Sequence, residues 1–562
     1  MILPARPDER DRVIRNLLRV CEVSREHRKN RTRRLRTMYL AGADDGDFSR
    51  YNKLREHVTF SSSYLYAPST VKFGVTMAPH YGDEWHEEKT AARDELQHLW
   101  QTSGATMTVK LGVEWAHVWD TAVFKLVIDQ GEVAVELVPD PADVGILHED
   151  RPFERQEAIA HWYLLSVPEF TRLVDLCLPH ETPAQRAEIA ALKDAAESWA
   201  MPGYEAVSDM LPPTVARTIL LSQAAPNMVG NVMAGTDTAL ALPRVTDPVV
   251  RLAELWVWDD ERSDYRVFTH FIPTETVLWD TMNPLDPRCH PFHALTLMPT
   301  PGYAWGVSPL QYLYPLQRWR EKKLAELDLR DDLQLDPPLF FQGLSHIDGE
   351  RAKAFRRPGG SIASAMPNAS VSPVVPGPLV EPFGMVERID ADFSRIGGLP
   401  VLPGMRGQTG EPGARSGEQQ MTQALLTAGP TLDKAMSVEH CVAALATGML
   451  RVHARLHGES LRTTSGREFF LSQLPLSDLH VQVWGHSHSP LYAEQVVQRA
   501  VLARDRGAMD NEDFLEYLGL PLTENLIAKS RKLAEAAAEK QERAIRIRET
   551  EAEARKLRAT SR

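Results

Sequence analysis

Apolar residues recur at helical spacing between residues 308 and 334, in the middle of the chain. Ser308 is a good capping residue, Pro309 suits the first helical position, and Gln311 can complete a capping box. The leucines that share one face are Leu310, Leu313, Leu316, Leu324 and Leu327. The pattern predicts a helix roughly 40 Å long, with an early kink at Pro315.

A second, shorter helix is predicted downstream of the first. Pro337-Pro338 ends the first helix, and the segment from Phe383 to Ile396 predicts another, which Gly397-Gly398 terminates. Between the two, Leu339-Phe340-Phe341 and the run from Ser361 to Leu379 suit short strands and turns, because the run is rich in Val, Ser, Pro and Gly. The sequence therefore predicts two helices that bracket a β-containing tip.

A Gly/Pro-rich stretch, residues 399–416, follows the shorter helix and leads into a further helical pattern. A loop of this length is usually functional or disordered rather than a plain connector. Ser416 and Gln419 form a second capping-box signature, and apolar helical spacing continues from Met421 to about Leu456. Because Gly429-Pro430 lies inside this pattern, we expect a kinked helix.

The rest of the chain alternates predicted helices and strands. Helical patterns before residue 125 occupy Asp8–Met38, Tyr51–His57, Thr90–Gln101 and Thr108–Thr121. Extended segments are predicted at Tyr64–Phe73 and Ala158–Leu165, and hairpins at Ala122–Val138 and at Val250–Trp258 with Tyr265–Ile272. A helical insertion covers Val167–Met201, and the last predicted elements are strands at Phe469–Ser472 and Leu479–Trp484 and helices at Leu491–Arg506 and Asp510–Gly519.

The first predicted helix is unusually basic. Its cations are Arg25, Arg28, Lys29, Arg31, Arg33, Arg34 and Arg36. They would suit an arm that contacts phosphates or a partner, or alternatively a solvated helix face. The second interpretation is favoured by Asp44, Asp45 and Asp47, which follow closely and could pair with them.

Composition restricts the classes of function. The net charge of −13 over 562 residues argues against a protein that grips nucleic acid over a broad basic surface. It is compatible with a channel through which DNA slides, because an acidic wall avoids tight phosphate binding. No apolar run approaches the roughly 18 residues that would span a bilayer, and the N-terminus is charged from Arg6 onward, unlike a signal peptide.

The motifs of the sequence do not indicate an active site. The four cysteines (Cys21, Cys177, Cys289 and Cys441) are far apart and are expected to be free buried thiols. A dense cluster comprises His80, Asp83, Glu84, His86, Glu87 and Glu88, but it lacks the His-Glu-x-x-His spacing and suits a solvated acidic turn better than a metal site. His486 and His488 could share one face, yet no third ligand is close in sequence. The glycine-rich loop lacks the lysine of a phosphate-binding loop. We therefore predict a protein that is not an enzyme and that holds no metal or cofactor.

The order of helix, β-containing tip, shorter helix, Gly/Pro loop and long kinked helix resembles the portal protein of tailed bacteriophages. The resemblance implies an α+β, elongated protomer with an α/β wing, a two-helix stem, a β-containing clip, a long kinked wing helix and a helical crown. The divisions it implies are a charged arm (1–50), wing (51–306, with the insertion at 167–201), stem helix (307–334), clip (335–382), second stem helix (383–398), tunnel loop (399–416), kinked wing helix and wing strands (417–490), and crown with C-terminal tail (491–562).

A portal protein forms a ring at one capsid vertex for packaging, retention and ejection of the genome. The resemblance implies a homo-dodecamer that surrounds double-stranded DNA and contacts the terminase large subunit, a head-completion or adaptor protein, the major capsid protein and a scaffold, with no membrane partner. The chain is expected in the host cytoplasm during assembly and then in the virion.

The resemblance also implies which residues meet DNA or neighbouring subunits. The expected DNA-contacting residues of the tunnel loop are Arg406, Gly407, Gln408, Thr409, Gly410 and Arg415. The stem residues expected to face the lumen or neighbouring protomers are Arg318, Arg320, Glu321, Lys322, Lys323 and Glu326. Two rival functions are a head–tail adaptor, which would also form rings, and a metal-dependent hydrolase, which would require a convergent carboxylate or histidine site.

Overall fold

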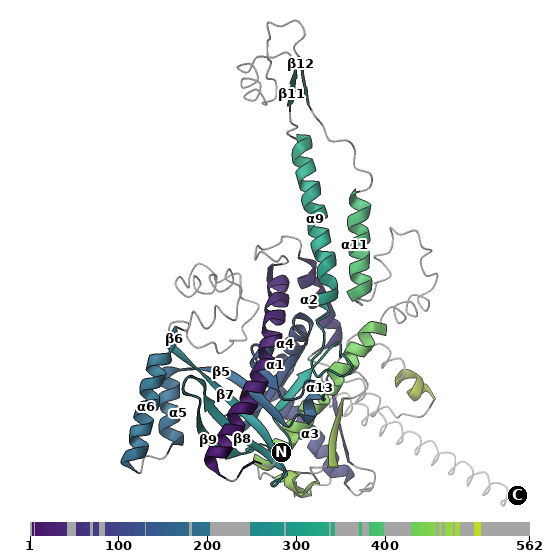
Figure 1. The fold of residues 1–562 in the computed structure, drawn as a ribbon. Coiled ribbons are helices and arrows are strands. Elements are labelled where there is room, and N and C mark those ends of the chain that lie inside the picture. Colours follow the sequence, from purple (N-terminus) through teal and green to yellow (C-terminus); the bar gives the residue numbers. More distant parts are fainter. Residues whose placement is uncertain are drawn as a thin grey trace, which may run out of the picture.

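The computed structural model describes residues 3–4, 6–41, 52–67, 71–77, 85–129, 131–178, 182–202, 248–285, 288–335, 339–342, 370–373, 382–397, 429–456, 460–462, 467–475, 478–483 and 500–506. Helices and antiparallel sheets are mixed, so the predicted α+β class is confirmed. Most of the sheets and helices form one body, from which two helices project side by side (Figure 1).

The largest sheet has six strands, and all its pairings are antiparallel. Its main path runs β4 (Val144–Ile146), β5 (Ala158–Ser166), β7 (Pro248–Asp259), β8 (Asp264–Phe271) and β9 (Thr276–Met282), and β6 (Met201–Pro202) pairs with β7. Helix α1 (Pro7–Ala41) covers one face of this sheet (Figure 1). Its residues Ile14, Leu17 and Cys21 pack with Trp162 and Phe268.

The opposite face of the six-stranded sheet is covered in two parts. Helices α5 (Val167–Cys177) and α6 (Pro183–Trp199) pack over Val250 and Leu252. Further along β7, Trp256 joins the principal core of the molecule. Alternate residues of β7 therefore serve different cores, because successive side chains of a strand point to opposite faces.

The principal core forms around a three-stranded sheet, β10-β2-β3. Its strands are β2 (Ala122–Asp129), β3 (Glu132–Leu137) and β10 (Phe292–Leu295). The helices that contribute to this core are α3 (His86–Thr102), α4 (Ala105–Val118) and α13 (Gly429–Leu456). Small residues permit close packing here: a Cβ on Gly112 would overlap the ring of Phe124, so α4 lies directly on β2.

Two smaller strand pairs complete the body. Strand β1 (Phe73–Met77) pairs with β15 (Leu479–Val483), which joins segments about 400 residues apart in the chain. Strand β13 (Ser460–Arg462) pairs with β14 (Glu468–Phe470). The C-terminal part of the described chain is thereby fixed to its N-terminal part.

The projecting part begins at α9 (Leu310–Leu335) and returns along α11 (Pro382–Gly397). Strands β11 (Leu339–Gln342) and β12 (Ser370–Pro373) pair antiparallel at its far end (Figure 1). Among the described helices, none has a stretch long and apolar enough to cross a membrane.

Most of the predicted elements are confirmed. The hairpin around residues 129–131 is formed by β2 and β3, with Gly131 at a φ of 91° in the turn. The second hairpin is formed by β7 and β8, and both insertion helices begin with capping boxes, at Ser166 and Thr182. The strand pair at the tip and the two helices that bracket it are also present.

Other predictions need correction. Tyr64 and Leu65, which were expected to be extended, are the last residues of helix α2 (Lys53–Leu65), where Leu65 is buried and the amide of Tyr66 bonds the carbonyl of Ser62. Gly429 and Pro430, where a kink was expected, are the first residues of the described helix α13. Residues 417–428 of the predicted helix lie outside the described residues. Strand β9 was not predicted. Of the predicted crown, only residues 500–506 are described, mostly as helix.

Candidate functional site

The two projecting helices are the segments that the resemblance to portal proteins identifies as the stem. An ion pair joins them. Nε of Arg320 on α9 donates to Oδ1 of Asp390 on α11 at 2.8 Å. Nζ of Lys53, from α2 in the body, lies 3.0 Å from the other oxygen of Asp390. A single carboxylate therefore ties α9, α11 and the body together. We call α9, β11, β12 and α11 the stem unit.

The predicted stem charges divide into two groups. Glu321 accepts a hydrogen bond from Gln317 at 2.7 Å, and Lys323 donates to Glu326 at 2.6 Å. With Arg320, these residues contact side chains of their own protomer. The Arg320 side chain is 11% exposed and paired with Asp390, so within one protomer it contributes to the contact between α9 and α11. Arg318 and Lys322 are exposed on the surface of α9.

The base of the stem unit is embedded in an apolar cluster. Leu310, Leu313 and Tyr314 on α9 and Phe393 on α11 are buried together with residues of α1, α2 and α4. The start of α9 is anchored as well: Oγ of Ser308 donates to the carbonyl of His117 at 2.6 Å and accepts from the amide of Leu310 at 3.1 Å. The cap predicted at Ser308 is confirmed.

The side chain of Gln311 bonds helix α1 instead of completing the predicted capping box. Its side-chain oxygen accepts a hydrogen bond from Arg31 of α1 at 3.1 Å. The same arginine nitrogen lies 3.4 Å from the carbonyl oxygen of Gly306. The end of α1 therefore supports the first turn of the stem unit.

Four helices meet where the stem unit returns to the body. Nζ of Lys434 on α13 donates to the carbonyl of Gly397, the last residue of α11, at 3.1 Å. A cation at this place is favourable because the C-terminal carbonyls of a helix carry partial negative charge. The ring of His57 on α2 lies against the same glycine, since a Cβ there would overlap it. His117 on α4 is 6.4 Å from His57 between ring centroids.

Burial controls the protonation of this junction. It lowers the pKa of His57 to about 3, with a smaller contribution from Lys434, and it lowers the pKa of His117 as well. Burial also lowers the pKa of Lys434 to about 8. Neither ring nitrogen of His57 has a hydrogen-bond partner among the described residues. The two histidines are therefore neutral at pH 7.

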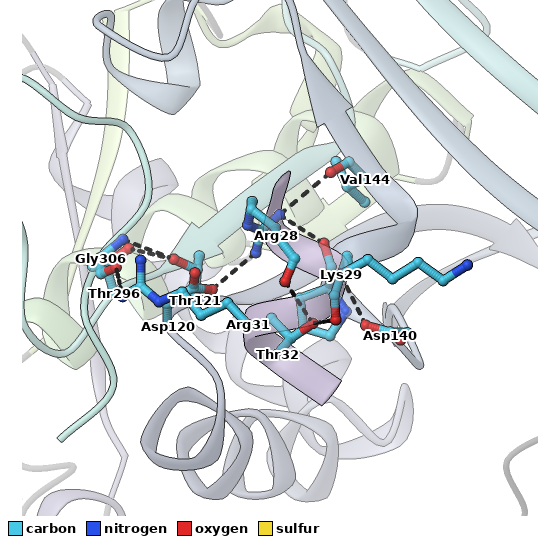
Figure 2. A network of polar contacts seen from close by, with 12 residues as sticks. Arg28, Lys29, Arg31, Thr32, Asp120, Thr121, Asp140, Val144, Thr296 and Gly306 are labelled. Atoms are coloured by element: carbon cyan, nitrogen blue, oxygen red, sulfur yellow. Dashed lines mark hydrogen bonds and ion pairs between the residues drawn. The ribbon is translucent and has the colours of Figure 1, made fainter. Parts of the chain in front are cut away.

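The basic row of α1 has a role that the sequence did not reveal. Arg28 is 1% exposed, and Nη2 donates to Oδ1 of Asp120 at 3.0 Å (Figure 2). Its Nη1 donates to the carbonyls of Pro141 and Val144 at 2.8 and 3.3 Å. The guanidinium carbon lies 3.4 Å from the centroid of Trp305. This arginine is a buried connector between α1, the end of α4 and the segment before α9.

Arg25 repeats the arrangement one turn earlier. Its Nη2 donates to Oδ1 of Asp143 at 2.7 Å, and its guanidinium lies 5.2 Å from the ring of Trp162. Burial and the nearby Asp140 raise the pKa of Asp143 to about 6, although Arg25 opposes the shift. Both interpretations of the basic helix, a phosphate-contacting arm and a solvated face, are therefore wrong for Arg25 and Arg28.

A signal for this burial was present in the sequence. The two arginines continue the apolar face of α1, since Ile14, Leu17, Cys21, Arg25 and Arg28 follow helical spacing. Their carboxylate partners lie 92 and 118 residues away, at Asp120 and Asp143. Spacing along one helix could indicate the face but could not identify those partners.

The remaining candidate sites are only partly described. The expected tunnel-loop residues Arg406, Gly407, Gln408, Thr409, Gly410 and Arg415 lie outside the described residues, as do His80, His486, His488 and the side chain of His86. Glu88, from the weak metal cluster, is buried and contacts Arg467 at 3.1 Å. Among the described residues no group of three His, Cys, Asp or Glu side chains could hold a metal ion.

Comparisons with known proteins return only distant similarities. No protein-family profile matches the sequence, and no curated protein matches it. The structure is similar to a chain in "Virion of native gene transfer agent (GTA) particle", with 11% identity and a TM-score of 0.39 over 87% of this chain and 93% of that chain. It is also similar to a chain in "Neck of empty GTA particle computed with C6 symmetry", with 10% identity and a TM-score of 0.40 over the same shares. Both TM-scores are low, so these likenesses assign neither a fold family nor a function.

Proposed function

We propose that this chain is a portal-type structural protein of a phage-like particle, one subunit of a ring that surrounds double-stranded DNA. The observation that carries the proposal is the stem unit, in which α9 and α11 project from the sheet body and hold a strand pair at the far end. Lys434 on α13 then fixes the return of the chain to the body at Gly397. Helix, strand pair, helix and long helix follow one another in the order that portal proteins have.

The stem unit is built to keep its direction relative to the body. Asp390 is held by one cation of the stem and one of the body, Arg320 and Lys53. The base is packed in an apolar cluster, and α1 supports the first turn of α9 through Arg31. A projecting helix pair of fixed direction suits the wall of a channel, where each subunit must present the same surface to the axis.

The proposal includes the partners and location that this role requires. The ring would be a homo-dodecamer in the virion, assembled in the host cytoplasm. It would be used for genome packaging, retention and ejection. Its partners would be the terminase large subunit, a head-completion or adaptor protein, the major capsid protein and a scaffold. Chemical catalysis would belong to those partners.

Ring formation tests the proposal directly. Twelve chains of 63.1 kDa would give a particle of about 760 kDa. We expect mass photometry of the purified protein to show closed oligomers of this order, and negative-stain images to show rings with a central opening. A protein that stays monomeric across the accessible concentration range would contradict the proposal.

A second experiment tests the channel role apart from assembly. We expect deletion of residues 404–413, in the proposed tunnel loop, to leave rings intact but to impair packaging or retention of DNA. The loop's only cations are Arg406 and Arg415, and a ring of such residues would touch phosphates as the duplex passes. The matched variant retains the loop length and replaces only these two arginines with Gln. Normal genome filling in both variants would remove the loop's assigned role.

A further inference from the structure

The outer surface of α9 carries large apolar side chains. Tyr312 is 53% exposed, Trp319 41% and Leu329 60%. Tyr312 and Trp319 are seven residues apart, so they lie two turns apart on nearly the same side of the helix. The side that faces α11 carries Arg320, which bonds Asp390, and it lies well around the helix from Trp319. Leu329 lies opposite Arg320 around the helix, whereas Trp319 and Tyr312 lie about a quarter turn to its side, and all three remain exposed beside α11.

The outer surface of α11 carries a small residue and two cations, whereas that of α9 carries large apolar side chains. Ile389 and Phe393 are buried on its inner side, whereas Ala391, Arg388 and Arg395 are exposed. Ala391 lies nearly opposite Ile389, since two residues turn a helix by about 200°. This surface therefore presents a small side chain between two arginines, one turn to either side.

The Arg320–Asp390 ion pair sets the two surfaces at the same height along the stem unit. Helices α9 and α11 are connected through the tip and run antiparallel (Figure 1). Trp319 lies one residue toward the body from Arg320, and Ala391 lies one residue toward the body from Asp390. At about 1.5 Å per residue, Trp319 and Ala391 are therefore level with each other, Trp319 on the flank of α9 and Ala391 on the side of α11 opposite its buried Ile389.

We propose that the α9 surface of one protomer packs against the α11 surface of a second copy of this chain, with Trp319 seated on Ala391 between Arg388 and Arg395. This inference rests on the proposed ring, and it names the contact between neighbouring subunits. Rotation about an axis parallel to the stem unit leaves heights unchanged, so the level residues of adjacent copies meet, and such head-to-tail contacts close into a ring.

The chemistry of the two surfaces favours a second copy of this chain as the partner. Guanidinium groups stack on the faces of Trp and Tyr, and Arg395 lies at a height between Trp319 and Tyr312. Arg388 lies between the heights of Trp319 and Glu326, whose carboxylate is exposed on the same side of α9. Lys322 shares this side, and its long aliphatic stem allows the ammonium group to turn to solvent.

Cysteine cross-linking tests the contact. The variant Trp319→Cys/Ala391→Cys, made in a Cys177→Ser/Cys289→Ser background, is treated with a short bismaleimide, which spans the 8–10 Å between packed helix axes. A cross-link within one protomer joins no second chain, so covalent oligomers report only links between different chains. We expect a ladder of covalent oligomers on a denaturing gel. The matched control, Trp319→Cys/Glu197→Cys, uses an exposed position on α6 and is expected to lose the ladder.

Images of the same samples separate the two proposals. Rings without a ladder would overturn the Trp319–Ala391 contact and leave the proposed function standing. Monomers without a ladder, with unchanged circular dichroism, would overturn both. Rings that give the ladder support both.

A substitution supplies a second readout that does not depend on cross-linking. Ala391→Trp fills the position where Trp319 would sit, so we expect it to shift the protein from rings to monomers in mass photometry. Ala190→Trp places the same side chain on an exposed position of α6 and is expected to leave the ring fraction unchanged. Equal ring fractions in the two variants would contradict the contact.

Discussion

Helices α1 and α9 are both rich in alternating charges, yet the fold places their cations in opposite environments. Arg25 and Arg28 of α1 are buried on acidic partners from distant segments. Arg318 and Lys322 of α9 are exposed, because among the described residues α11 is the element that packs along that helix beyond its base. A charge pattern alone therefore does not tell a helix whose cations are buried on distant partners from one whose cations are exposed. If this difference is real, removing a buried charge of the body should lower the free energy of unfolding more than removing a charge of the stem unit.

The largest expected effect follows the loss of Arg28. In Arg28→Met the carboxylate of Asp120 stays buried without its cation, and breaking a buried pair in this way costs about 3–5 kcal/mol. We expect the free energy of unfolding in urea to fall by that amount at fixed protein concentration. Arg318→Met on α9 should change it by less than about 0.5 kcal/mol.

A double variant separates the ion pair from simple packing. Replacing a whole buried pair by apolar residues is often nearly neutral. Arg28→Met/Asp120→Leu should therefore recover most of the stability that Arg28→Met loses. If the double variant is less stable than the single one, the loss comes from packing on Trp305 rather than from the uncompensated carboxylate.

The next effect tests how closely α1 lies on the sheet. A Cβ on Gly145 of β4 would overlap the backbone carbonyl of Cys21, and a backbone atom cannot turn aside as a flexible side chain can. Gly145→Ala should lower the free energy of unfolding by about 3 kcal/mol, as overpacking in a core does. Ala325→Ser, at an exposed position of α9, should remain within about 0.5 kcal/mol of the parent protein.

Acid should affect the body through its buried histidines, whereas α9 and α11 contain none. The pKa of His57 is lowered from 6.5 to about 3 in the folded protein. Below pH 6.5 His57 binds a proton in the unfolded chain but stays neutral in the folded protein, so the free energy of unfolding falls as the pH falls toward 3. For this one residue the loss between pH 7 and pH 5 is about 2 kcal/mol.

The variant His57→Leu isolates that contribution. Its stability should fall by about 2 kcal/mol less than that of the parent protein between pH 7 and pH 5, measured by urea unfolding at both pH values. The difference between the two pH values is compared, so any packing change that acts equally at both cancels. An unchanged difference would show that His57 is solvated in the folded state.

The smallest effect concerns the charges of the stem unit itself. In Asp390→Asn the ion pairs with Arg320 and Lys53 are lost, and because Asp390 and Lys53 are 28% and 27% exposed the cost should be about 1 kcal/mol. Asp392→Asn, on the same helix, removes a pair with the exposed Arg395 and should have no measurable effect on unfolding. Equal effects would mean that Asp390 does not hold the stem unit to the body.

Local features of this protein could be predicted from sequence because they depend on neighbours in the chain. The turn at Gly131 requires a positive φ that glycine adopts readily, and the capping residues Ser166 and Thr182 bond amides three residues away. The two helices of the stem unit and the strands between them follow from patterns of the same short range. These local patterns determined the order of elements on which the proposed function depends.

Only the tertiary structure decided what the charged residues do. Arg28 and Asp120 are 92 residues apart, and β1 meets β15 across about 400 residues. Arg320 on the first helix of the stem unit bonds Asp390, seventy residues away. A charge on a helix is equally compatible with water and with a buried counter-ion, and its local sequence is the same in both cases. Which of the two occurs depends on the distant segments that the fold brings against it.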